Sequence, residues 1–173
     1  MKGPYVNQKE TSMRQSRNYM FSDVLLGTPD AVAKVKGDEN HRGLVGYVYF
    51  YGSAGGSLVL AEIEGLPYED QRCPNGIFGF HIHEGHSCSG TPEDPFADTK
   101  NHWNPEGCEH PEHAGDMPSL FGNRGFAWMM FYTDRFYPEE VVGKTVVIHD
   151  MPDDFRTQPS GDSGMKIACG EII

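Results

Sequence analysis

The segment GFHIHEG places two histidines, His81 and His83, one residue apart in what its neighbours indicate is a β-strand. Alternate residues of a strand point to the same face, so the two imidazoles project side by side while Phe80 and Ile82 face the other way. Buried imidazoles need hydrogen-bond partners or a metal ion, and neutral imidazole is the commonest protein metal ligand. The pair therefore indicates either a metal site or a polar strand face with chance histidines.

A second group of metal-ligating residue types follows in the irregular stretch NHWNPEGCEHPEHAGDMP. It contains three histidines and one well-spaced carboxylate: His102, His110, His113 and Asp116. Three imidazoles and a carboxylate make a suitable four-coordinate set for Zn²⁺. His149, in VVIHD, can join His81 and His83, and imidazoles from two strand ends suit copper or a catalytic zinc. Each histidine alone could be a surface or capping residue, but the ordered set predicts metal binding.

The composition limits the class of protein and its partners. A chain of 173 residues with 38% hydrophobic residues is expected to bury its own core. A net charge of −11 makes nucleic acid and anionic membranes improbable partners. The sequence contains no apolar run long enough to span a membrane and no apolar signal-peptide core. We therefore expect a cytoplasmic protein by default, with an extracytoplasmic location left open.

The elements that must position these histidines are short strands. Residues 1–28 are polar and aperiodic, and we interpret them as an N-terminal extension that can be flexible, followed by one domain over 29–173. A period of two, or β-branched and aromatic residues, marks the expected strands: 31–37, 43–52, 56–66, 76–85, 126–134, 143–151 and 165–173. Long irregular stretches cover 86–125 and 152–164. The pattern predicts an all-β sandwich or barrel with two long functional loops.

From about residue 31 to residue 173, the chain resembles the copper/zinc superoxide dismutase family. The resemblance rests on the order and spacing of GFHIHEG, HWNP, HAGDMP, GKTVVIH, PDDF and GDSGMKIACGEI. The two irregular stretches of this chain are short, and in this respect the chain is more similar to bacterial-type members of the family. The resemblance implies a Greek-key, immunoglobulin-like sandwich or barrel of about eight antiparallel strands, one copper ion and one zinc ion per chain, and conversion of superoxide to O₂ and H₂O₂.

The resemblance also implies a role for each ligand. The copper ligands would be His81, His83, His102 and His149. The zinc ligands would be His102, His110, His113 and Asp116, so His102 would bridge the two ions. Asp153 matches an aspartate that ties a copper histidine to a zinc histidine. Cys88 and Cys169 match a disulfide that anchors the ligand-bearing loop to the last strand.

Catalytic roles are implied for His102 and Lys166. In the implied cycle, copper alternates between Cu(II) and Cu(I), and His102 takes up a proton and returns it. Lys166 occupies the position of an arginine that guides the anionic substrate in the family. Lysine keeps the charge but lacks the planar guanidinium, so we expect activity lowered by less than about tenfold. The alternative is a solvated lysine at the end of a strand.

Other residues have no counterpart in the resemblance. Cys73 and Cys108 could form a second disulfide that holds the zinc loop, or could be two unpaired thiols. His86 is expected in an exposed loop and His41 in a turn. A dismutase-like protein that only holds zinc or copper is the alternative function, and a sandwich with inert histidines is a third. The chain could be a monomer or a homodimer.

Overall fold

The structure, a computed structural model, describes residues 26–70 and 76–173. Within these residues the chain forms nine strands: β1 (Ala31–Gly37), β2 (Val45–Ser53), β3 (Gly56–Glu64), β4 (Ile77–Phe78), β5 (Phe80–His83), β6 (Leu120–Phe121), β7 (Phe126–Thr133), β8 (Thr145–His149) and β9 (Lys166–Glu171). The helices described are one turn, α2 (Pro138–Val141), and the 3-10 helix Ala97–Thr99. Among the described residues, no helix combines the length and apolar character that crossing a membrane requires.

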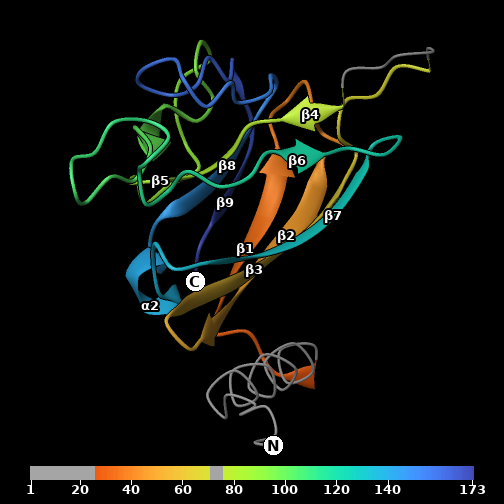
Figure 1. Cartoon of the computed structure of the whole chain (residues 1–173). Helices are drawn as coiled ribbons and strands as arrows, with labels where there is room; N and C mark the ends of the chain where they lie inside the picture. The colour runs from red at the N-terminus through yellow and green to blue at the C-terminus, as the bar shows by residue number, and fades with distance from the viewer. Residues whose placement is uncertain (1–25, 71–75) are drawn as a thin grey trace, which may run out of the picture.

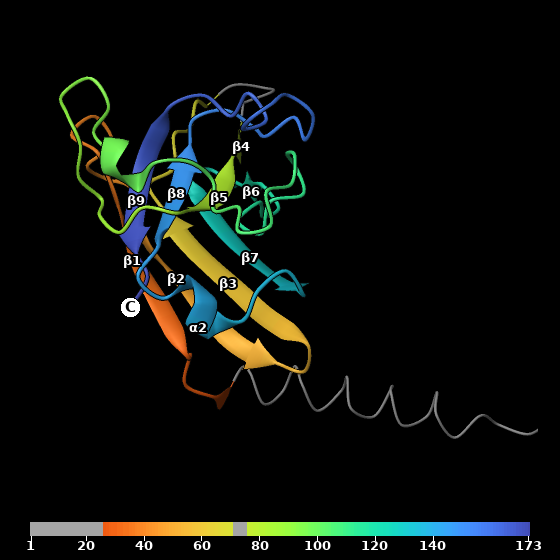
Figure 2. The same ribbon diagram turned by 90° about the vertical axis from the view of Figure 1, so that its left-hand side faces the viewer.

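Seven strands form one antiparallel sheet in the order β5-β8-β9-β1-β2-β3-β7, and β4 pairs with β6 separately. β1, β2 and β3 follow one another as a meander, whereas β9 returns to pair with β1 and β5 pairs with β8. The sheet curls into a half-barrel (Figures 1 and 2). The prediction of an all-β fold built from antiparallel strands is confirmed.

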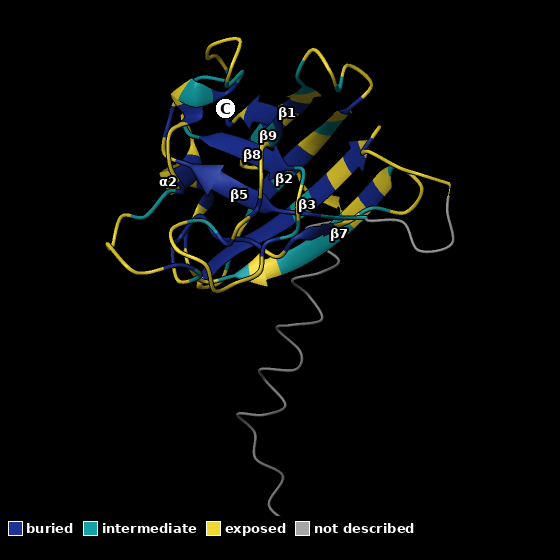
Figure 3. Ribbon diagram, turned by 90° about the horizontal axis from the view of Figure 1, so that it is seen from above, coloured by how far each residue is buried: buried dark blue, intermediate teal, exposed yellow. Residues whose placement is uncertain are grey.

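In β1, apolar residues alternate with polar ones, because alternate side chains of this strand face the core. In β1, Ala31, Ala33 and Val35 are buried, while Lys34 and Lys36 are exposed. The buried faces meet in one contiguous core that includes Phe50 and Phe80. In Figure 3, β5 and β8 are entirely buried, and many of the exposed residues lie in the loops.

Gly79 divides the predicted strand 76–85 into β4 and β5. Its backbone accepts a hydrogen bond from His149 N at 2.9 Å and donates one to Met151 O at 2.7 Å. A Cβ at this position would lie 2.8 Å from the Cβ of Ser163. The close approach of these segments requires glycine, so β4 pairs with β6 on one side of this point and β5 pairs with β8 on the other.

The two irregular segments, 84–119 and 150–165, lie at the same end of the sheet (Figure 1). A disulfide joins Cys88 in the first segment to Cys169 on β9, which confirms that predicted pairing. Cys73 lies outside the described residues, and Cys108 is exposed and pairs with no cysteine within 26–70 and 76–173. The predicted extension, 1–28, also lies almost wholly outside the described residues.

Candidate metal centre

Two sets of potential metal ligands are buried at this end of the sheet. The four-histidine group consists of His81, His83, His102 and His149, and the His/Asp group consists of His102, His110, His113 and Asp116. Within each group the ligand atoms all lie within 4.8 Å of one another. A tetrahedral metal ion needs donors about 2 Å from a common point, and both groups are compact enough for this. The structure therefore brings together all seven ligands expected from the sequence.

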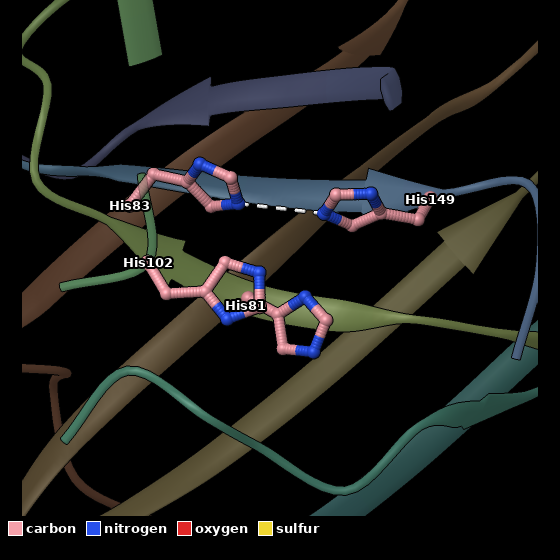
Figure 4. Close-up of side chains that lie close together, drawn as sticks. All are labelled: His81, His83, His102 and His149. Carbon is pink, nitrogen blue, oxygen red and sulfur yellow. Dashed lines mark hydrogen bonds between the residues drawn. The ribbon is translucent and has the colours of Figure 1, made fainter. Parts of the chain in front are cut away.

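The four-histidine group is assembled from two strands and one loop (Figure 4). β5 carries His81 and His83 on one face, while Phe80 and Ile82 on the opposite face enter the core. His149 ends β8, and its Nε2 lies 3.4 Å from Nε2 of His83. His102 comes from the first irregular segment, 84–119, and forms an isolated β-bridge with His83 of β5. Its ring centroid lies 3.9 Å from that of His81.

Asp116 is the centre of the His/Asp group. Its Oδ1 lies 2.7 Å from Nδ1 of His102, and its Oδ2 lies 3.0 Å from Nδ1 of His110. The Oδ2 atom is also 3.2 Å from Nδ1 of His113. His102 thus presents Nδ1 to this group, which leaves its Nε2 for the four-histidine group. One imidazole serves both groups through its two ring nitrogens.

Buried ring nitrogens without hydrogen-bond partners show that metal ions would fit these two groups. Within residues 26–70 and 76–173, four buried ring nitrogens have no hydrogen-bond partner: Nδ1 of His81, Nε2 of His102, and Nδ1 of His110 and His113. The last two approach Asp116, but without hydrogen-bond geometry. Burying an unsatisfied polar atom is costly, and a shared cation would satisfy these atoms together. The donor sets, imidazoles alone and imidazoles with a carboxylate, fit copper and zinc respectively.

Hydrogen bonds to the other ring nitrogens orient the imidazoles. Asp153 is 5% exposed, and its two oxygens lie 2.8 Å from Nε2 of His81 and 2.9 Å from Nε2 of His110. Nδ1 of His83 donates to the carbonyl of Lys100 at 2.9 Å. Such contacts fix the tautomer and leave the opposite nitrogen free to bind a metal. Asp153 lies within contact of both groups, as the sequence resemblance led us to expect.

Burial favours the neutral form of three imidazoles, His81, His83 and His149, and neutral imidazole is the form that binds metals. Burial lowers the pKa of His149 to about 4 and outweighs its hydrogen bond to Gly164. Burial and neighbouring histidines hold the pKa values of His81 and His83 well below the usual value. Burial alone would raise the pKa of Asp116, but the hydrogen bond and charges of its histidine partners lower it. Asp116 is thus an ionised ligand at neutral pH.

A cavity of about 510 Å³ opens onto the histidines and is lined by His83, His102, His149 and Lys166. The ammonium of Lys166 donates to Asp94 Oδ2 at 3.2 Å and to the carbonyl of Phe96 at 3.1 Å. Its side chain is 17% exposed, so it is not simply solvated. Sequence reasoning missed Asp94, whose loop position gives no signal of this contact.

Two further histidines lie outside both groups, as expected. His86 is exposed, and its Nδ1 hydrogen-bonds to the carbonyl of Gly143. His41 lies in a turn, with its Nδ1 2.7 Å from Asp38 Oδ1. Sequence reasoning also missed the role of the Lys100 carbonyl, because any residue can supply a backbone acceptor.

Comparison with known proteins identifies the family. The family model for copper/zinc superoxide dismutase matches residues 44–172. This chain belongs to the copper/zinc superoxide dismutase family. Curated members of the family include "Superoxide dismutase [Cu-Zn] 2" from Aquifex aeolicus, which is 36% identical over 132 residues, covering 68% of this chain and 72% of that protein. A "Superoxide dismutase [Cu-Zn]" from Deinococcus radiodurans is 32% identical, covering 73% of this chain and 76% of the relative.

Solved structures of the superoxide dismutase fold agree with the architecture. The Cu/Zn superoxide dismutase from Brucella abortus superposes with a TM-score of 0.69 at 24% identity, covering 82% of this chain and 99% of the other. A double mutant of a superoxide dismutase-like protein from Bacillus subtilis gives a TM-score of 0.64 at 26% identity, covering 80% of this chain and 94% of the other. The first likeness shows the fold, and family membership rests on the sequence matches.

Proposed function

We propose that this protein disproportionates superoxide to O₂ and H₂O₂ and binds one copper and one zinc ion per chain. The observation that carries this proposal is the pair of buried ligand groups joined by one imidazole, His102. A site that only stored a metal would not need two different donor sets sharing a ligand. Membership of the copper/zinc superoxide dismutase family supports the same function.

The four-histidine group would hold copper and the His/Asp group would hold zinc. Bound copper supplies one-electron redox chemistry, whereas zinc, a d¹⁰ ion, supplies none. Asp116 fixes Nδ1 of His102, so the nitrogen that can exchange a proton is Nε2, which faces the four-histidine group. His102 can therefore hold a proton at Nε2 and release it towards the cavity, where the product needs protons.

Lys166 would attract the anionic substrate into the cavity. The protein carries a net charge of −11, but the local potential at the site, rather than the net charge, steers a small anion. Two hydrogen bonds, to Asp94 and to the carbonyl of Phe96, hold the ammonium at the cavity wall. The pairing with Asp94 offsets part of its charge. This arrangement supports a guiding role weaker than that of an unpaired cation.

The deciding experiment measures metal content and superoxide dismutation on one sample loaded with copper and zinc. The variant His83→Ala removes one imidazole of the four-histidine group. The variant His86→Ala removes an exposed imidazole that lies outside both groups. We expect one equivalent of each metal and fast dismutation in the parent and in His86→Ala. His83→Ala should lose copper and activity but retain zinc. A parent that binds both metals without dismutation would be a metal-holding protein, the alternative function.

A further inference from the structure

Arg135, two residues beyond the end of β7, contacts the segment that carries most of the His/Asp group. One guanidinium nitrogen, Nη1, lies 2.8 Å from the carbonyl oxygen of Pro111 and 3.1 Å from that of His113. The same nitrogen lies 3.3 Å from the carbonyl oxygen of Asp116. His113 and Asp116 are two of the group's four ligands. Arg135 therefore contacts the backbone of ligand residues without touching their ligating atoms.

The other terminal nitrogen of Arg135 makes a weaker contact. Nη2 lies 3.5 Å from Oε2 of Glu112, whose side chain is 71% exposed. Exposed ion pairs of this length contribute little, because solvent screens them. A hydrogen bond from a charged donor to a carbonyl is stronger than one between neutral groups. The carbonyl contacts are thus the part of this arrangement that can hold the segment.

The segment 111–116 spans the two terminal strands of the seven-stranded sheet. On one side, the amide of Ile82 on β5 donates to the carbonyl of Gly115 at 2.9 Å. On the other side, Arg135 extends from the end of β7. Gln158 of the second loop adds a pair of hydrogen bonds with the backbone of His110. Among these contacts, those that connect the segment 111–116 to the end of β7 are made by the side chain of Arg135.

We propose that Arg135 is a positioning residue for the zinc site. Its guanidinium fixes the peptide units at His113 and Asp116, and so sets the angle at which both side chains reach the ion. The inference rests on the proposed function only in assigning zinc to the His/Asp group. The N–H groups of a planar guanidinium point in fixed directions, whereas the three N–H donors of a lysine ammonium rotate on a flexible stem. Lysine should therefore hold these carbonyls less rigidly than arginine, although it keeps the positive charge.

The test uses the full chain and two measurements that do not depend on dismutation. One is the rate at which the zinc-loaded protein loses zinc to a chromogenic chelator. The other is the visible spectrum of the protein with Co²⁺ in the His/Asp group, which reports ligand geometry. Arg135→Ala should release zinc about tenfold faster, the lower end of the usual effect of losing an outer partner of a metal ligand, and should change the cobalt bands. Arg135→Lys should fall between Arg135→Ala and the parent. Glu112→Gln, which removes only the exposed pair, should match the parent.

Parent-like zinc release and cobalt spectra in Arg135→Ala, with a folded protein by circular dichroism, would overturn the inference. If Arg135→Ala does not fold, Arg135→Lys decides, and parent-like values in that variant would overturn it equally. A parent that binds zinc but does not dismutate superoxide contradicts the proposed function alone. A parent that binds neither zinc nor cobalt contradicts both.

Discussion

Asp153 has both carboxylate oxygens committed, one to His81 and one to His110. Asparagine has nearly the same shape but only one acceptor oxygen, so Asp153→Asn leaves one of these imidazoles facing an NH₂ group. We expect copper or zinc affinity to fall about 10- to 100-fold, the usual effect of losing an outer partner of a metal ligand. Competition with a chelator of known affinity measures this, with Asp154→Asn as the control at an exposed neighbour. Unchanged affinity for both metals would contradict the prediction.

Lys166 and Asp94 should have opposite effects on the rate. Lys166→Gln removes a positive charge from the cavity wall, and we expect about tenfold slower dismutation at low ionic strength with a weaker dependence on salt. Asp94→Asn removes the charge that opposes Lys166 and should raise the rate and steepen the salt dependence. Lys36→Gln, on the exposed face of β1, changes the net charge equally and is the control. Rates that follow net charge in all three variants would refute local steering.

At the level of single residues, the sequence predicted which side chains would meet but not what holds them. His81 and His83 share a strand face by simple alternation, so their proximity could be anticipated. The acceptor for His83 is the carbonyl of Lys100, which carries no side-chain signature. Contacts such as Asp94 with Lys166 depend on loop paths, which only the folded chain determines.

Among the elements, the disulfide Cys88–Cys169 ties the first loop to β9 across a sequence separation of 81 residues. Cys88→Ser with Cys169→Ser should lower the free energy of unfolding by about 2–5 kcal/mol, since the unfolded chain gains freedom when so long a loop is opened. Urea denaturation of the metal-free protein measures the change. Cys108→Ser, at an exposed cysteine that does not belong to this disulfide, should stay within about 0.5 kcal/mol of the parent. Equal stabilities for all three proteins would contradict the prediction.

The strands could be predicted where alternation was long enough to read. β1 has the predicted bounds, and β3 and β7 lie within a few residues of theirs. β6, Leu120–Phe121, was missed because two residues cannot show a period. The break at Gly79 depends on the approach of Ser163, far along the chain, which no local pattern reveals. Strands whose bounds depend on contacts between residues far apart in the sequence could therefore not be predicted from local patterns.

For the molecule as a whole, burying neutral imidazoles makes the stability of the metal-free protein depend on pH. The pKa of His149 is about 4 when folded, against 6.5 for an ordinary histidine, so below pH 6.5 the unfolded chain binds a proton that the folded chain does not. Stability therefore falls as the pH decreases from 6.5 to 4, by on the order of 3 kcal/mol from this group. His81 and His83 act in the same direction.

Urea unfolding of the metal-free protein at several pH values between 7 and 4.5 measures this dependence. His149→Gln should show a shallower slope, because the substituted side chain does not titrate in this range. A free energy of unfolding that stays constant over the range would refute the prediction.

The shared imidazole of His102 has a thermodynamic consequence for the whole protein. Because one ring belongs to both ligand groups and Asp153 touches a histidine of each, neither ion can bind without altering the site of the other. Binding equilibria linked in this way are reciprocal. Whatever factor zinc applies to copper affinity, copper must apply to zinc affinity. The order in which a cell delivers the two metals can change how quickly the protein matures, but not the final balance between its metal-bound forms.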